Sequence, residues 1–227
     1  MQCSLYGKVP AKRDFIAIGA PRNFLNAWEP WLQGAISASR TTLGEKWQSA
    51  FLTAPIWRFW LGADICGRSA IGAFMSSLDG VGRYFPLTVF ACADDNAAIP
   101  PPEFASQDDW FDAAEAFLMS TLEHDASFEA MTADLAALPP PSQELPETAA
   151  PDANCNGACA VPAHGRSFSE LFTSIRIRDH GRIYAGSTFW WTIGGEGIAP
   201  VALSGKGMPD PFLFSAMLTG NFAHAPA

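Results

Sequence analysis

Apolar residues near the start of the chain recur at helical spacing. Between positions 21 and 41 they lie three or four residues apart, which is the spacing of one buried helical stripe. The stripe consists of Phe24, Leu25, Trp28, Trp31, Leu32, Ala35 and Ile36. Pro30 lies inside it, and we expect it to kink the helix or divide it in two, because proline lacks an amide hydrogen and clashes with the preceding turn. A second, short helix is predicted at 45–53.

Strand-like runs and further helices follow. Strands are predicted at residues 4–9, 56–62, 70–78, 85–93, 183–193 and 199–203, the last two as a hairpin around Gly194, Gly195 and Gly197. The run at 85–93 is almost continuously apolar, which indicates a central strand buried on both faces. Helices are predicted at 108–123, 128–138, 167–177 and 211–218. Ser167 and Glu170 have the spacing of a capping box at the start of the third of these.

The segment 139–165 differs in composition from the rest of the chain. Six of its 27 residues are proline and none is aromatic, which is typical of a loop or linker. The residues after it are too few for a good independent core. We therefore predict one α/β domain with a main part at 1–138, a proline-rich loop or linker at 139–165, and helices and a hairpin at 166–227 that complete the same domain. Its sheet is expected to be mixed, with helices on both faces.

Overall composition narrows the class of protein. The 227 residues (24.4 kDa) are 48% hydrophobic and 16% charged, which excludes wholesale disorder. A net charge of −9 and a pI of about 4.8 exclude a nucleic-acid binder that works by bulk electrostatics. No stretch reaches the roughly 18 uncharged apolar residues of a membrane helix, and the first fifteen positions lack the apolar core of a signal peptide. We expect a cytoplasmic protein without membrane insertion.

The negative charge is unevenly distributed. No lysine or arginine occurs from Tyr84 to Gly165, whereas fourteen acidic residues lie between Asp94 and Asp152. The rest of the chain carries fourteen bases against nine acids. If the acidic block folds onto the body, the molecule has two electrostatically different faces. These serve either solubility or the docking of a basic partner.

The five cysteines do not form an evident metal site or disulfide framework. Cys3, Cys66 and Cys92 lie in apolar surroundings and are interpreted as small buried hydrophobes. Cys155 and Cys159 are spaced C-x3-C with His164 nearby, but a zinc site needs a second ligand pair. A disulfide between these two cysteines is an alternative, and a nucleophilic cysteine is a weaker one. We predict no metal and no cofactor.

Catalytic motifs are also lacking in the sequence. The turn at 79–83 contains Gly80 and Gly82 but has the spacing of neither a Walker P-loop nor a dinucleotide fingerprint, and a strand-to-strand turn with positive φ accounts for both glycines. The histidines are scattered at positions 124, 164, 180 and 224. No nucleophile elbow or paired-histidine motif is present.

Tryptophan is unusually frequent. Five of the eight have core-like spacing, namely Trp28, Trp31, Trp47, Trp57 and Trp60. Trp190 and Trp191 are adjacent, and neighbours on a strand point to opposite faces of the sheet. One of the pair must therefore pack on the opposite sheet face under a helix, or be exposed, where it could anchor a protein partner.

Four segments resemble motifs of the type VI secretion-associated TagF family, also called ImpM. They are Tyr6-Gly7-Lys8-Val9-Pro10 with Asp14-Phe15, Leu52-Thr53-Ala54-Pro55-Ile56-Trp57-Arg58-Phe59, Asp79 with Val81-Gly82-Arg83-Tyr84-Phe85-Pro86-Leu87, and Ser187 with Trp190-Trp191. They occur in the family's order and cover residues 3–92 and, more loosely, 183–193. Three positions depart from the family pattern: Arg13 replaces a usual glycine, Ser76 a usual proline, and Gly80 an often basic residue.

The resemblance implies an α/β sandwich and a cytoplasmic accessory protein without enzymatic activity. Family members are similar in repressing type VI secretion after translation, beside a threonine kinase and phosphatase pathway. The implied partner is a forkhead-associated scaffold protein. The family brings no catalytic residues, so none are assigned. The residues singled out for partner binding or for bracing the motifs are Lys8, Asp14, Arg58, Asp79, Arg83, Trp190 and Trp191.

Several hypotheses remain open at this point. Lys8 with Asp14, and Asp79 with Arg83, either pair internally and brace the turns or present a polar patch to the partner. A small hydrolase is an alternative, which requires Asp79, Arg83 and a serine or histidine to converge on a pocket. A structural subunit of the secretion apparatus is a third.

Overall fold

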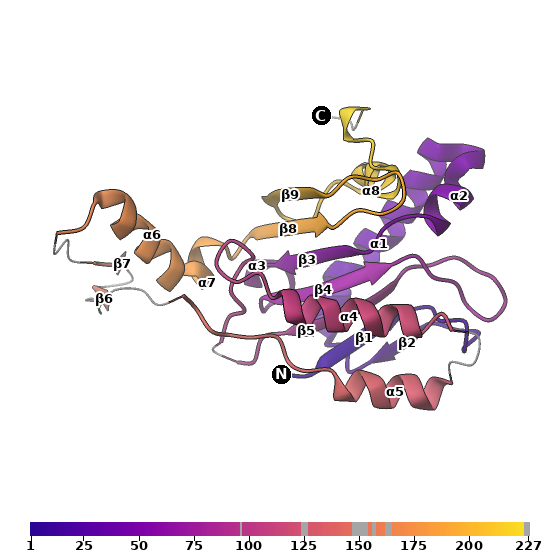
Figure 1. The fold of residues 1–227 in the computed structure, drawn as a ribbon, viewed down its shortest axis with the longest axis horizontal. Helices are drawn as coiled ribbons and strands as arrows, with labels where there is room; N and C mark the ends of the chain where they lie inside the picture. The colour runs from indigo at the N-terminus through magenta and orange to yellow at the C-terminus, as the bar shows by residue number, and fades with distance from the viewer. Residues whose placement is uncertain (96, 124–126, 147–153, 156–157, 162–164, 225–227) are drawn as a thin grey trace.

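The computed structural model describes residues 1–95, 97–123, 127–146, 154–155, 158–161 and 165–224. Seven strands form one sheet in the order β2-β1-β5-β4-β3-β8-β9 (Figure 1). Their bounds are β1 Cys3–Gly7, β2 Ile16–Ile18, β3 Trp57–Leu61, β4 Ala70–Met75, β5 Leu87–Cys92, β8 Ser187–Thr192 and β9 Val201–Lys206. Every pairing among the described strands is antiparallel, so the predicted mixed sheet is corrected to an antiparallel one. The α/β class with helices on both faces is confirmed.

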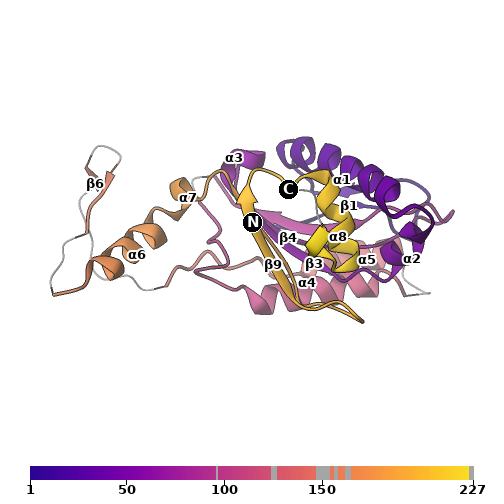
Figure 2. The ribbon, with the colours of Figure 1, turned by 90° about the horizontal axis from the view of Figure 1, so that it is seen from above.

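Helices cover the two faces of the sheet unequally (Figure 2). Their bounds are α1 Arg22–Leu43, α2 Trp47–Leu52, α3 Ala63–Cys66, α4 Asp108–Ser120, α5 Phe128–Ala137, α6 Phe168–Arg178, α7 His180–Ile183 and α8 Phe214–Thr219, with short 3-10 turns η1 Gly44–Lys46, η2 Pro211–Leu213 and η3 Phe222–His224. One face carries α1 and α8, which pack on each other. The other carries α4 over β4 and β5, and α5 beside β1.

The core on the α1 face is built from the predicted helical stripe. Phe24, Trp28 and Leu32 are almost fully buried, and the Trp28 ring lies parallel to the Trp190 ring at 5.7 Å. Pro30 does not divide the helix, which runs unbroken through it. All five tryptophans predicted for the core are buried. Burial of these rings supplies much of the stabilisation, because a large aromatic side chain contributes both apolar area and ring contacts.

The helix and the hairpin predicted after residue 165 are present, with small differences in where the elements begin. The capping box of Ser167 and Glu170 is present at the start of α6. The hairpin of β8 and β9 pairs with β3, so the segment after 165 joins the main sheet. The strand predicted at 183–193 begins later, at Ser187, because Ile183 still belongs to the helical turn α7. Strand β2 and helix α3 lie where no element was predicted from the sequence.

Part of the proline-rich segment has defined structure. Residues 139–146 run along the body, and the Gln107 amide bonds to both backbone groups of Ser142, at 2.7 Å to its oxygen and 2.9 Å from its nitrogen. Beyond it, β6 (Asn154–Cys155) pairs with β7 (Ala158–Cys159) as a separate hairpin. The described residues of this segment are therefore held by hydrogen bonds that a plain linker lacks.

Candidate functional site

Two of the quoted motifs, some seventy positions apart in sequence, meet at one end of the sheet. The chain leaves β1 into the loop 8–15, and it turns from β4 to β5 through 76–86. The Gly80 amide donates to the Lys12 carbonyl oxygen at 2.7 Å. A Cβ on residue 80 would lie 2.9 Å from the Pro10 carbonyl oxygen, so glycine allows the loops to touch. Gly82 adopts the predicted positive φ, at +84°. For Gly80 that prediction is wrong, and glycine is needed there for the close approach of the loops.

The Asp79 carboxylate lies at the centre of this contact and is fully buried. Lys8 Nζ donates to its Oδ2 at 2.9 Å, and Arg83 Nε donates to the same oxygen at 2.6 Å. Its Oδ1 accepts the amides of Val81 at 3.1 Å and Arg83 at 2.9 Å. Four donors thus satisfy one carboxylate, two of them from the turn itself.

These hydrogen bonds set the ionisation of the cluster. Burial by itself raises the pKa of the Asp79 carboxyl because the charged form loses water. The hydrogen bonds from Lys8 and Arg83 favour the charged form more strongly, so the pKa of Asp79 lies well below its ordinary range. The carboxylate is therefore charged at neutral pH.

The predicted pairing of Lys8 with Asp14 is wrong. Lys8 pairs with Asp79, because the sheet places the end of β1 against the turn after β4. Asp14 is 96% exposed and lies 3.8 Å from Arg83 Nη2, which also donates to the Arg13 carbonyl oxygen. Asp79 and Arg83 do pair, as predicted.

Around this buried core the two loops present side chains to solvent. Phe15 is 49% exposed, packs edge-on against Phe85 at 4.7 Å, and lies beneath Lys8 Nζ at 4.8 Å from its ring centre. Val81 is 57% exposed although its amide is held by Asp79. The exposed side chains of Asp14, Phe15, Val81 and Arg83 are called the loop patch below.

Arg58 forms the second charge cluster, on the sheet face that α4 covers. It points from β3 toward α4, where Asp108, Asp112 and Glu115 lie along one side of the helix. The distances from its guanidinium to these carboxylates are 3.7, 3.2 and 2.5 Å in that order. The guanidinium also lies 4.9 Å from the centre of the Phe111 ring. One buried cation thus neutralises part of the acidic block and fixes α4 on the sheet.

The tryptophan pair divides between the faces, as alternation requires. Trp190 is buried in the α1-face core. Trp191 lies on the α4 face, opposite Arg58 in the strand pairing, and packs edge-on against Phe111 at 5.0 Å. Trp191 is partly exposed, so both alternatives considered for it hold in part: it meets a helix and still reaches solvent.

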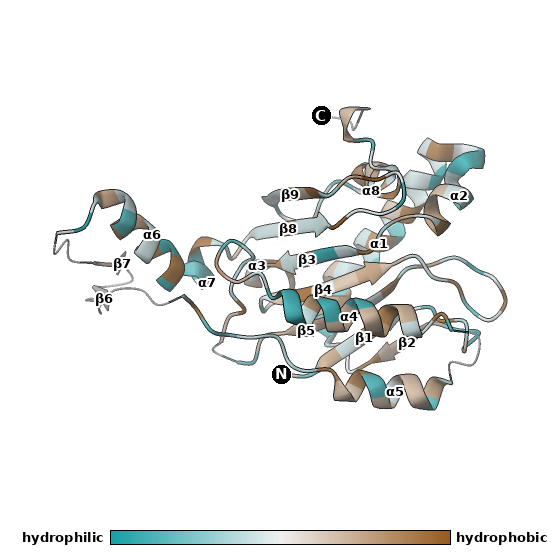
Figure 3. Ribbon diagram, in the orientation of Figure 1, coloured by the Kyte–Doolittle hydropathy of each residue, from teal (hydrophilic) through white to brown (hydrophobic). Residues whose placement is uncertain are grey.

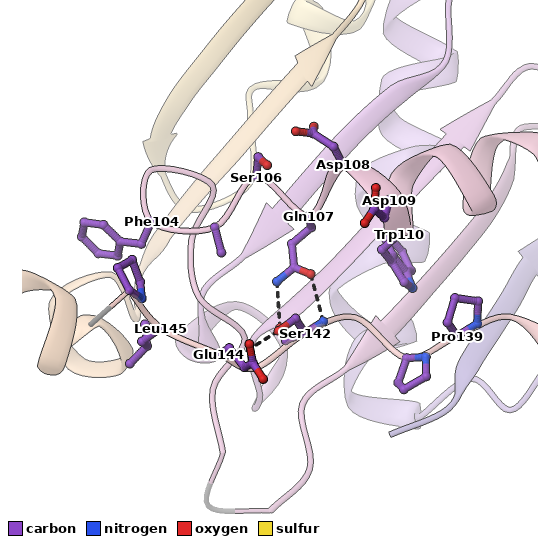
Figure 4. A pocket seen from close by; sticks show the side chains of 13 residues that line it. Phe104, Ser106, Gln107, Asp108, Asp109, Trp110, Pro139, Ser142, Glu144 and Leu145 are labelled. Carbon is purple, nitrogen blue, oxygen red and sulfur yellow. Dashed lines mark hydrogen bonds between the residues drawn. The ribbon is translucent and has the colours of Figure 1, made fainter. Parts of the chain in front are cut away.

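A cavity of about 650 Å³ lies between the start of α4 and the segment 139–146 (Figure 4). Its walls include Phe104, Trp110, Leu145 and the carboxylates of Asp108 and Asp109. None of the motif residues lines it. Sequence reasoning missed this cavity because residues 139–146 gave no signal of returning to α4.

Among the described residues, four cysteines are free thiols, namely Cys3, Cys66, Cys92 and Cys159. Burial raises the pKa of Cys66 to about 11 and the pKa of Cys92 to about 12. His124 and His164 lie outside the described residues. Within the described ranges no cluster of three metal-ligating side chains is present, and no helix is long and apolar enough to cross a membrane.

A family model and a solved structure are similar to this chain in sequence and in fold. Residues 4–138 match the family model of the TagF N-terminal domain, described as type VI secretion system-associated. The crystal structure of PA0076 from Pseudomonas aeruginosa PAO1 is similar, with a TM-score of 0.78 and 29% sequence identity, over 100% of this chain and 98% of that chain. No curated protein matches in sequence. The family match covers more than half of the chain and contains both loops of the Asp79 cluster, and the chain therefore belongs to the type VI secretion-associated TagF family.

Proposed function

We propose that this chain is a cytoplasmic, non-enzymatic regulator that represses type VI secretion after translation by binding a forkhead-associated scaffold protein. Membership of the TagF family supports the association with type VI secretion. The repressor role and the partner come from the resemblance described above. The loop patch is the surface we assign to this partner.

The observation that carries this assignment is the Asp79 cluster. Two family motifs use a buried lysine, a buried aspartate and an arginine to hold two loops in one fixed arrangement. A loop that is already rigid loses less conformational entropy when it binds a partner. The loop patch combines apolar surface with charges of both signs, the composition of a protein contact and not of a small-molecule pocket.

The hydrolase alternative fits this geometry poorly. It requires Asp79 and Arg83 to converge on a pocket with a serine or histidine. Both oxygens of Asp79 are occupied by hydrogen bonds and are closed to solvent. A carboxylate in this state has neither access to a substrate nor a free lone pair for general base work.

Surface variants of the tagged, full-length chain test the proposal. Val81→Asp places a charge on the loop patch without removing a bond to Asp79, so it should abolish recovery of the forkhead-associated protein from a host lysate while the melting temperature is kept. The matched control is Ile193→Asp, because Ile193 is 63% exposed just beyond β8, which β3 separates from β4 and its turn. Recovery should be unchanged with this control.

Deletion of the gene separates a repressor from a structural subunit. Increased secretion supports repression, and loss of secretion supports the subunit alternative. If mass spectrometry identifies no secretion component with the wild-type chain, the proposed partner is wrong. If Val81→Asp and Ile193→Asp bind equally well, the partner stands and the loop patch is the wrong surface.

A further inference from the structure

Helix α6 and the turn α7 form an arm that extends away from the body of the molecule (Figures 1 and 2). Phe168 and Phe172, one helical turn apart, lie on the same side of α6. They are 77% and 64% exposed. A single exposed apolar residue is ordinary, but two neighbouring phenylalanines on a projecting helix form a patch that marks an interaction site.

The body has an incomplete layer on its α4 face. Helix α4 packs over β4 and β5, and beside it Phe189, Trp191 and Ala202 of β8 and β9 face a cavity of about 380 Å³. Pro102 and Asp108 form its walls. Apart from the edge-on contact between Phe111 of α4 and Trp191, no described helix packs closely on this face of the two strands, although an apolar sheet face is normally covered by a second layer. This cavity and its floor are called the slot.

The arm and the slot are complementary in charge as well as in apolar character. Asp108 and Asp112, at 67% and 75% side-chain exposure, lie along the edge of α4 beside the slot. The arm, residues 166–182, contains four arginines and two acidic residues, so it is net positive. Figure 3 shows hydrophilic as well as hydrophobic residues along α4. The apolar side of the arm therefore fits the floor of the slot, and its basic residues fit the acidic edge.

We propose that the slot of one copy receives helix α6 of a second copy, so that the chain forms a twofold-symmetric dimer. The arm continues through α7 directly into β8, the strand that forms the floor of the slot. Arm and slot are therefore neighbours, and a twofold axis beside them places each arm at the other copy's slot. Phe168 and Phe172 pack on Phe189 and Trp191 of the second copy. The inference does not depend on the proposed partner of the loop patch.

The oligomeric state of the purified, full-length chain tests this directly. Sedimentation equilibrium across a wide concentration range should give twice the chain mass of 24.4 kDa. Phe168→Asp combined with Phe172→Asp should raise the dimer dissociation constant about thirtyfold or more, the effect of losing a buried aromatic anchor. Phe212→Asp is the matched control, because Phe212 is 49% exposed and lies in η2, outside both arm and slot. It should leave the dimer intact.

A mixing experiment identifies the two halves of the contact. Ala202→Glu places a carboxylate in the slot beside Asp108 and should also give a monomer. The arm variant keeps its slot, and the slot variant keeps its arm. Mixed together, they can restore one of the two contacts, so a heterodimer weaker than the wild-type dimer should appear. Circular dichroism of each variant establishes that it is folded.

Three results would overturn the proposal. The wild-type chain could remain a monomer at every concentration, which would mean that the slot is covered by the chain's own arm or by another protein. The dimer could be insensitive to the arm variant, which would place the interface elsewhere, for instance at the free edge of β9. The folded arm and slot variants could fail to associate when mixed. If Ala202→Glu does not fold, the comparison of the arm variant with Phe212→Asp still shows whether the arm forms the dimer contact.

Discussion

The two charge clusters of this protein differ in how much water reaches their carboxylates. Asp79 is fully buried and has four donors, two from side chains and two from the turn. Around Arg58 the cation and most of Glu115 are buried, but Asp108 and Asp112 remain mostly exposed. An exposed ion pair contributes little to stability, whereas removing one partner of a buried, satisfied pair is costly. The Asp79 cluster therefore holds the loops together, and the Arg58 cluster leaves negative charge on the surface.

Loss of Asp79 should have the largest effect. Asp79→Ala leaves Lys8 and two turn amides without their acceptor in a closed site, so the melting temperature should fall by about 10 °C or more. Differential scanning calorimetry measures this. Asp134→Ala, on the exposed side of α5, is the control and should change little. A small fall for Asp79→Ala would mean that water enters the cluster.

Acid should weaken the Asp79 cluster in a defined direction. Its folded pKa is depressed, so its contribution is fully present above the unfolded carboxyl pKa of about 4 and is lost as pH falls toward the folded value. Urea midpoints measured from neutral pH downward should therefore decline below about pH 4 in the wild type. Asp79→Asn should show a lower midpoint at neutral pH and a shallower decline in acid. Parallel curves for the two proteins would contradict this assignment.

Replacement of Arg58 should cost less than loss of Asp79. Arg58→Met keeps the apolar stem but removes the bonds to α4. Asp108 and Asp112 then return to water, whereas Glu115, whose side chain is 16% exposed, loses its partner. We expect the free energy of unfolding to fall by about 2 kcal/mol, measured by urea denaturation. A fall as large as that of Asp79→Ala would mean that the carboxylates of α4 depend on Arg58 more than their exposure indicates.

The smallest effect is expected at the exposed end of the second cluster. Asp112→Asn should change stability by no more than about 0.5 kcal/mol, and added salt should remove the difference from wild type. The loss caused by Asp79→Ala should persist at high salt, because buried pairs are poorly screened. Thermal melts with and without salt compare the two. Equal salt sensitivity would remove the distinction between the clusters.

The sequence by itself determined the type of most elements and the apolar side of each. The stripe on α1, the capping box of α6 and the central strand β5 follow from spacing, because helix and strand periods of 3.6 and 2 place buried residues at fixed intervals. The alternation of side chains along a strand likewise predicted that Trp190 and Trp191 lie on opposite faces of the sheet. The motifs also identified the family, and they named Lys8, Asp79 and Arg83 before any contact was known.

Only the tertiary structure decided which residues meet. Lys8 binds Asp79 and not the nearby Asp14, because the sheet pairs β1 with β5 and so places the loop after β1 against the turn before β5. Arg58 pairs with Glu115 of α4 because α4 crosses the sheet on the face to which the Arg58 side chain points from β3. Such contacts join residues more than fifty positions apart, and local periodicity contains no information about strand order or about which helix covers which face. The exposure of the α6 arm was equally invisible in sequence, since an amphipathic pattern gives the face that is apolar but not what packs against it.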